Sequence, residues 1–336
     1  MNNLLDPAIL FFAFGALAGA VKSNLEIPAP ISRFLSLYLL MALGLKGGFA
    51  LAQSGLTAQV ASGLACALTL ALVVPVLALQ FLRRLVGPYD AAALAATYGS
   101  VSAVTFVTAV QYLETRGLPY GGHMAAAMAL MESPAIILAV LFANTLKRGT
   151  PAATIGASGA GGSLALAAPG AAALSMRKVL HESFTDGAQL LLLGAMVVGL
   201  LTGESGRAAM QPFSGDLFKG MLAFFLLDMG LLTARNLPKV RGQSPWLLAY
   251  AILAPLLHAM LALGLARTVG LPLGDTILLM VLAASASYIA VPAVLRHAIP
   301  QANPSLYFGL SLGLTFPFNI LLGIPLYASL AAWAMA

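Results

Sequence analysis

The chain has 336 residues, of which 60% are hydrophobic and only 8% are charged, and its mean hydropathy is +0.93. A soluble domain carries about 25% charged residues, so this composition excludes a water-soluble protein and indicates an integral membrane protein. The 17 basic residues outnumber the 11 acidic ones. They lie in loops between apolar stretches, where they set membrane orientation and do not indicate a nucleic-acid partner. The single cysteine, Cys66, excludes an internal disulfide and a cysteine-based metal site.

Ten stretches predict membrane-spanning helices, each of which needs about 20 mostly apolar residues. The segment "MNNLLDPAIL" lacks the positive charge that begins a signal peptide, so the first stretch is expected to be a retained span. The last stretch contains Pro317 and Pro325, which predict a kink or a break. In chain order the predicted spans cover residues 7–21, 31–52, 57–82, 90–112, 121–146, 181–203, 214–237, 245–268, 275–298 and 303–333.

An uncharged, Gly/Ala-rich stretch between the fifth and sixth spans predicts a flexible linker. We expect it to divide the chain into a first five-helix repeat (1–148), a cytoplasmic linker (149–178) and a second five-helix repeat (179–336).

Membrane orientation follows from the basic residues, because the cytoplasmic side of a membrane protein carries the excess of them. The predicted cytoplasmic side carries Lys22, Arg33, Arg83, Arg84, Lys147, Arg148, Arg177, Lys178, Arg235, Lys239, Arg241 and Arg296. The predicted outer side carries Lys46, Arg116, Arg207, Lys219 and Arg267. The linker then lies inside the cell and both termini lie outside.

Three pairs of similar segments indicate that the second half is an inverted copy of the first. Five spans is an odd number, so the second half must enter the membrane from the opposite side. Inverted repeats are typical of secondary transporters, whose sites lie at mid-membrane where discontinuous helices meet. The pairs occur in the same order: "LLMALGLKGG" (39–48) with "FLLDMGLLTA" (225–234), "GSVSA" (99–103) with "ASASY" (284–288), and "ESPAI" (132–136) with "TFPFN" (315–319).

Two Ser-x-Ser motifs lie near the middle of the fourth and ninth predicted spans. Gly99 and the pair Val291-Pro292 weaken the helices there, so we expect both helices to be discontinuous. Exposed N–H groups at helix N-termini, together with serine hydroxyls, would form an anion site. The alternative is that small residues only allow close helix packing. The motifs comprise Ser100, Ser102, Ser285 and Ser287.

Acidic and amide side chains occur at mid-membrane depth elsewhere. Glu132 and Asp228 lie near the centres of the fifth and seventh spans. Because a carboxylate inside the membrane costs free energy, we expect each of them to serve in the ion or substrate path. Asn319 follows Pro317 and can offer an oxygen to a hard cation. The alternative for each is a structural hydrogen bond to a backbone group.

Four other polar residues are assigned structural roles. Asp90 and Asp275 begin repeat-related spans and are expected to cap their helices. Lys46 is expected to extend its ammonium group to the membrane surface. His258 is expected to be packed and hydrogen-bonded.

The segments "FLSLYLLMALGLKGG", "YGSVSAVTF" and "MESPAIILA" together resemble the sodium-dependent bicarbonate symporter family of cyanobacteria and other bacteria (SbtA type). The resemblance covers nearly the whole chain. It implies an all-α integral membrane protein with ten transmembrane helices in a 5+5 inverted repeat, divided into a gate and a core domain. It further implies a homotrimer in the bacterial plasma membrane, sodium-coupled bicarbonate uptake, and a cytoplasmic PII-like regulatory protein as partner. Sodium would be the coupling ion, with no cofactor.

The resemblance also implies where the two solutes bind. Bicarbonate would lie near Gly99, Ser100, Ser102, Thr105, Ser285 and Ser287. Sodium would lie close by. Its candidate ligands are chosen mainly for their depth in the membrane and comprise Glu132, Ser133, Asn319 and Asp228. A small planar monoanion such as bicarbonate needs several short hydrogen-bond donors. An organic dicarboxylate would more readily use an arginine, and no arginine is expected at mid-membrane.

Other functions stay open at this point. A sodium-coupled symporter of another small anion or carboxylate is the main alternative, and a sodium–proton antiporter using Glu132 or Asp228 is the second. An intramembrane aspartyl protease is disfavoured, because "FFLLDMG" lacks a glycine two residues before Asp228. We therefore expect a transporter and not an enzyme.

Overall fold

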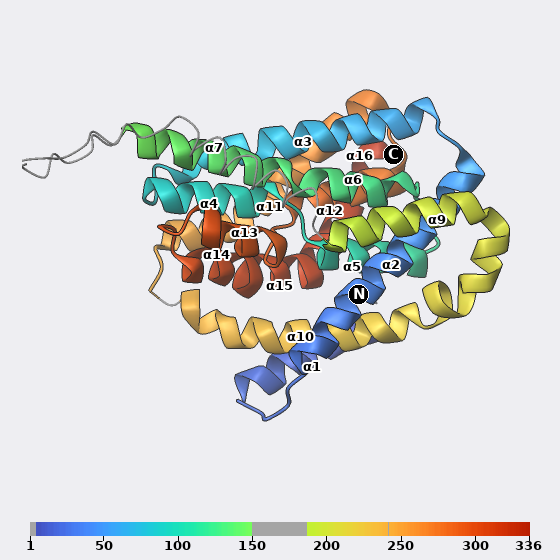
Figure 1. Ribbon diagram of the computed structural model, residues 1–336, viewed down its shortest axis with the longest axis horizontal. Coiled ribbons are helices and arrows are strands. Elements are labelled where there is room, and N and C mark those ends of the chain that lie inside the picture. Colours follow the sequence, from blue (N-terminus) through green and yellow to red (C-terminus); the bar gives the residue numbers. More distant parts are fainter. Residues whose placement is uncertain (1–4, 150–186, 241) are drawn as a thin grey trace, which may run out of the picture.

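The computed structural model describes residues 5–149, 187–240 and 242–336, and every regular element in these ranges is a helix (Figure 1). Apart from Gly149, the predicted linker 149–178 lies outside the described residues.

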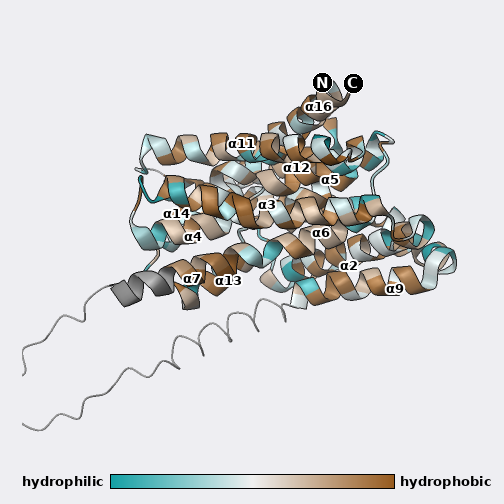
Figure 2. Cartoon of the chain, turned by 90° about the horizontal axis from the view of Figure 1, so that it is seen from above, coloured by the Kyte–Doolittle hydropathy of each residue, from teal (hydrophilic) through white to brown (hydrophobic). Residues whose placement is uncertain are grey.

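Seven helical stretches in these ranges are long and apolar enough to cross a membrane, and two further apolar helices are shorter. Figure 2 shows hydrophobic residues along the lengths of the helices and hydrophilic residues in connecting segments. Large apolar side chains such as Leu257 and Val198 are 64% and 51% exposed, which suits a surface covered by lipid. The prediction of an all-helical, multi-pass membrane protein is confirmed.

Four helices pack together as two pairs, at the lower right of Figure 1. In one pair, α1 (Pro7–Ala20) packs along α10 (Phe218–Asn236). In the other, α2 (Ala29–Ser54) packs along α9 (Gly187–Met210). We call this group the four-helix layer: α1 (Pro7–Ala20), α2 (Ala29–Ser54), α9 (Gly187–Met210) and α10 (Phe218–Asn236), with the short π-helical segment η2 (Gln211–Asp216) between the last two and the 3-10 turn η3 (Leu237–Val240) at the end.

Glycines bring the helices of both pairs into backbone contact. A Cβ on Gly44 of α2 would collide with the carbonyl of Leu192 in α9, and a Cβ on Gly230 of α10 would collide with the carbonyl of Phe12 in α1. Small residues permit such close approach between membrane helices. The two glycines that the sequence similarity pairs therefore have the same packing role in the two helix pairs.

The remaining helices form a second group, which we call the crossing bundle. Its interrupted helices are shielded from lipid, because residues 91–99 and 274–284 are all buried. The group comprises α3 (Ala58–Leu82), α4 (Pro88–Gly99), α5 (Ala103–Thr115), α6 (His123–Glu132), α7 (Pro134–Gly149), α11 (Pro245–Val269), α12 (Leu273–Ala284), α13 (Ala290–Ala298), α14 (Pro304–Leu310), the π-helical turn η4 (Ser311–Thr315), α15 (Phe316–Phe318), the π-helical turn η5 (Asn319–Gly323) and α16 (Ile324–Met335).

Both Ser-x-Ser motifs interrupt their helices, as predicted. In the first, α4 ends at Gly99 and α5 begins at Ala103; in the second, α12 ends at Ala284 and α13 begins at Ala290. Each apolar segment that reads as one span is therefore a pair of half-helices joined by a short non-helical connection.

Proline residues account for the irregularity of two other segments. The last predicted span alternates between α-helical and π-helical turns on both sides of Pro317, a residue that cannot donate a backbone hydrogen bond. The fifth predicted span is interrupted at Ser133, where α6 ends and Pro134 begins α7. The expected irregularity of the last span is confirmed, and the interruption at Ser133 was not expected.

The expectation that Asp90 and Asp275 cap their own helices is wrong. Asp90 accepts a hydrogen bond from the N–H of Asn303 at 2.7 Å, and Asp275 accepts one from the N–H of Gly121 at 2.5 Å. Each aspartate lies inside the first turn of its helix, three residues after the N-cap position, and reaches a loop of the other half of the chain. Each half of the chain thus accepts an equivalent hydrogen bond from a loop of the other half.

We predict that Gly230→Ala destabilises the folded protein, whereas the matched change Gly264→Ala in α11 does not. The added methyl group at position 230 meets the α1 backbone, while at position 264 it meets nothing within 4 Å. Overpacking costs about 1–3 kcal/mol, and alanine otherwise favours a helix over glycine by about 1 kcal/mol. Thermal unfolding in detergent should show a lower midpoint for the first variant alone. Equal midpoints would contradict the close packing described here.

Candidate functional site

The two interrupted helices bind each other at their breaks. The N–H of Ser102 donates to the Oγ of Ser285 at 2.9 Å, and the N–H of Ser287 donates to the carbonyl of Thr97 at 2.8 Å. All four serines of the two motifs are buried, with at most 4% of any side chain exposed. The sequence prediction that the motifs meet inside the protein is consistent with this geometry.

The second serine of each motif stabilises the start of the following half-helix. Ser102 Oγ accepts bonds from the N–H of Thr105 at 3.3 Å and from its hydroxyl at 3.0 Å. Ser287 Oγ accepts from the N–H of Val291 at 3.3 Å. A helix leaves its first N–H groups without intrahelical partners, so each serine caps one of them. The N–H groups of Ala103 and Val104 precede the capped one in α5.

The first serine of each motif donates its hydroxyl proton to a carbonyl. Ser100 bonds the carbonyl of Glu132 at 2.9 Å, and Ser285 bonds the carbonyl of Leu282 at 2.9 Å. Their protons are therefore engaged within the protein. Of the two kinds of donor that the sequence predicted, backbone N–H groups at the half-helix starts therefore remain, whereas the hydroxyls of Ser100 and Ser285 are engaged within the protein.

Three of the four predicted sodium ligands lie beside the breaks. Glu132 and Ser133 form the junction of α6 and α7, next to Ser100. Asn319 lies beside the other break, where its amide donates to the carbonyl of Ala284 at 2.8 Å and its oxygen accepts from Tyr327 at 2.8 Å. The two helix breaks are thus each bordered by oxygen-bearing groups.

Asp228 belongs to the four-helix layer and not to the helix breaks. Its carboxylate accepts a short hydrogen bond from the hydroxyl of Ser32, and only 4% of it is exposed. It lines a cavity of about 1150 Å³ that lies between the four-helix layer and the crossing bundle. Tyr288 and Ile289, which belong to the second break, line the same cavity.

The lining of this cavity extends from the second break to the C-terminal end of α10 and the connection between α1 and α2. Its charged lining has more basic than acidic groups, and such an excess raises the local concentration of anions. The basic residues are Arg33, Arg235, Lys239 and Arg296, and the acidic ones are Glu26 and Asp228. The cavity thus places an anion-attracting surface beside the second break.

Tyr288 is the functional candidate that the sequence analysis missed. Its hydroxyl contacts Ser102 and donates to the sulfur of Met229 at 3.7 Å, so it joins the first break to the four-helix layer. A phenol directly after the second Ser-x-Ser motif was the available signal.

His258 is buried and bonds the backbone of Ala283, which confirms its expected structural role.

A family model described as the Na+-dependent bicarbonate transporter superfamily matches residues 7–332. No curated protein sequence matches the chain.

We predict that a cysteine at position 289 reacts with a membrane-impermeant maleimide at least tenfold faster than one at position 322. In the wild type the two side chains are similarly exposed, 55% for Ile289 and 59% for Leu322. Ile289 lines the charged cavity, whereas we expect Leu322 to face lipid, where a thiol cannot ionise and react. Both variants carry Cys66→Ser. Equal rates would show that the cavity does not reach the second break from water.

Proposed function

Because the chain belongs to the Na+-dependent bicarbonate transporter superfamily, we propose that it carries bicarbonate into the cell across the bacterial plasma membrane together with sodium. The observation that supports this most is the buried crossing of two broken helices. Helix starts present N–H donors and a positive dipole end, which stabilise a small anion without a basic side chain.

We propose that bicarbonate binds at the crossing, between the two Ser-x-Ser motifs. Specific contacts fix the position of the backbone there. A Cβ on Gly99 would collide with the ring of Pro75 in α3, so only glycine lets the end of α4 approach that helix. Ser102 and Thr105 hold the first turn of α5. The predicted anion residues, Gly99, Ser100, Ser102, Thr105, Ser285 and Ser287, all belong to these two breaks.

We propose that sodium binds beside the anion, with Glu132, Ser133 and Asn319 as its ligands. Sodium is a hard cation that prefers oxygen, and a cation next to bicarbonate offsets the charge that the anion brings into the membrane. Asp228 is a further cation-binding group, placed in the cavity through which a sodium ion would reach or leave the crossing.

Transport by alternating access is supported by the pairing of equivalent contacts between the halves. When each helix is replaced by its counterpart in the other proposed repeat, the α1–α10 pair becomes the α9–α2 pair. The same replacement turns the bond between Asp90 and the loop at Asn303 into the bond between Asp275 and the loop at Gly121. Inverted repeats commonly exchange conformations by rigid-body movement of one group against the other. We propose that the crossing bundle moves against the four-helix layer.

The charges of the large cavity support an inward-facing state. Arg33, Arg235, Lys239 and Arg296 line this cavity, and all four belong to the predicted cytoplasmic side. This orientation leaves both termini outside the cell. A homotrimer and a cytoplasmic PII-like regulatory partner are further proposals that rest on the family resemblance alone.

The direct test is uptake of labelled bicarbonate by purified protein in proteoliposomes under an inward sodium gradient, with potassium as the control cation. Uptake that requires sodium is expected. Competition by a panel of small carboxylates would identify a different anion. Acidification or alkalinisation driven by sodium without bicarbonate would instead support an antiporter and overturn the proposal.

We predict that the double variant Ser102→Ala, Ser287→Ala loses at least nine tenths of bicarbonate uptake while it remains folded. Both half-helix caps are removed, and each cap contributes about 1 kcal/mol, so the helix starts lose their fixed positions. The control is the pair Ser205→Ala, Ser329→Ala, whose hydroxyls are exposed. Initial uptake rates and size-exclusion profiles report the two properties. Uptake at the wild-type rate by a folded double variant would remove the shared site from the account.

We predict that Glu132→Gln raises the sodium concentration needed for half-maximal uptake about tenfold and leaves the order of competing anions unchanged. The amide keeps the shape of the side chain but removes the charge that attracts a cation. The matched control is Glu204→Gln, since Glu204 is an exposed carboxylate in α9. An unaltered sodium dependence would assign Glu132 a purely structural role.

A further inference from the structure

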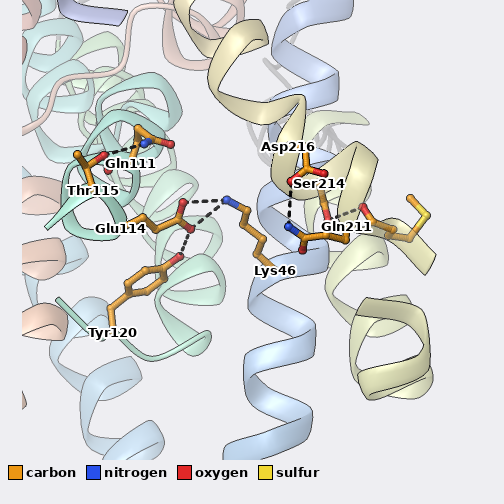
Figure 3. Close-up of polar contacts among 9 residues, drawn as sticks. Lys46, Gln111, Glu114, Thr115, Tyr120, Gln211, Ser214 and Asp216 are labelled. Atoms are coloured by element: carbon orange, nitrogen blue, oxygen red, sulfur yellow. Dashed lines mark hydrogen bonds and ion pairs between the residues drawn. The ribbon is translucent and has the colours of Figure 1, made fainter. Parts of the chain in front are cut away.

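An ion pair joins the two groups of helices at the end of the molecule opposite the large cavity. The ammonium group of Lys46 in α2 lies 2.9 Å and 3.0 Å from the two carboxylate oxygens of Glu114 in α5 (Figure 3). The hydroxyl of Tyr120 donates to the same carboxylate at 3.0 Å. The ammonium also lies 4.0 Å from the centre of the Phe218 ring. Lys46, which the sequence predicted to extend its ammonium group to the membrane surface, thus ends in an ion pair with the other group of helices.

The position of the pair along α2 places it far from the large cavity. Ser32 and Ser36, near the start of α2, line that cavity. Lys46 follows Ser32 by about 21 Å along the helix axis, at about 1.5 Å per residue. Around Lys46 and Glu114 lies a separate cavity of about 700 Å³, which Gln211 and Lys219 also line. The two cavities thus lie at opposite ends of the contact between the four-helix layer and the crossing bundle.

Among the described residues, this is the ion pair that connects the two groups. The contact between His123 and Asp275 lies within the crossing bundle, and that between Arg207 and Glu204 lies within α9. Other hydrogen bonds between the groups in these residues join uncharged partners, such as Thr233 with the carbonyl of Leu312. Within the part of the chain that the structure describes, the ion pairing between the groups is therefore concentrated at one point.

The surroundings of the pair suit a bond that holds and can be released. The side chains of Lys46 and Glu114 are 19% and 29% exposed, so water screens their attraction less than at an open surface. The adjacent 700 Å³ cavity can hydrate both groups when they separate. Burial and the neighbouring Glu114 carboxylate raise the pKa of Tyr120 well above its usual value, so its hydroxyl stays a donor at physiological pH.

We propose that Lys46 and Glu114 form a latch that holds the crossing bundle against the four-helix layer on one side while the large cavity is open on the other. Opening the latched side requires the pair to separate. The inference rests on the proposed alternating access, since a latch has a role only if the two groups move relative to each other. The latch sets the balance between the two states and contacts neither solute.

Two cysteine reporters in a Cys66→Ser background test the latch. Ser36→Cys lies in the large cavity. Thr108→Cys lies at a position that is 5% exposed and lines a smaller cavity, about 260 Å³, between α5 and the start of α1. In Glu114→Gln and in Lys46→Met, the reaction of Thr108→Cys with an impermeant maleimide should accelerate about fivefold. The reaction of Ser36→Cys should slow about fivefold.

Two further variants separate the latch from general effects. The exchange Lys46→Glu with Glu114→Lys should restore both rates to within twofold of the parent, whereas either reversal alone should shift them further than neutralisation. Arg207→Gln removes another charge that lines the 700 Å³ cavity and should change neither rate.

The outcomes are distinguishable. Opposite shifts with restoration by the exchange support the latch. Unchanged rates in Glu114→Gln overturn it, and a rise of both rates also overturns it, because that result reports loosening of the fold. Sodium-driven bicarbonate uptake by the parent protein is measured in parallel. Uptake with unchanged reporter rates rejects the latch alone, whereas absence of uptake rejects the proposed function.

Discussion

A membrane protein must pair every backbone polar group that it buries, because lipid offers no hydrogen-bond partner. This chain opens two helices in its interior and so exposes helix ends where they are most costly. The breaks solve the problem for each other: the N–H of Ser102 is paired by Ser285, and the N–H of Ser287 by Thr97. The remaining structure follows from keeping these two breaks together and away from lipid.

The helices around the breaks serve that requirement. Residues 91–96 of α4 are small, apart from Leu94, and all are buried, which lets neighbouring helices close over the crossing. Asp90 and Asp275 fix the N-terminal ends of α4 and α12, which lie away from the breaks, to loops of the opposite half. Because each half thus holds an end of the other half's interrupted helix, the bundle can shift as a unit. In the described ranges of the chain, the four-helix layer contacts the bundle through a mostly apolar surface and one ion pair.

The parts of this arrangement that sequence reasoning found are those with a local cause. The breaks follow from glycine and serine in an apolar segment, and the irregularity of the last span follows from Pro317. The parts that it missed depend on distant partners. The Lys46–Glu114 pair spans 68 residues and the Asp90–Asn303 bond spans 213, and no local pattern relates such positions.

The candidate site divides in the same way. The four serines were identified because their spacing repeats, but their roles as caps and as partners of carbonyls depend on the fold. Asp228 was grouped with Glu132 on depth alone, whereas it belongs to the cavity wall.

The central claim is that backbone N–H groups at the crossing bind the anion. Solid-state NMR of ¹³C-bicarbonate with ¹⁵N-labelled protein measures this directly. The account predicts sodium-dependent dipolar contacts to backbone nitrogens of residues 102–105, and contacts only to arginine side chains of the large cavity would contradict it.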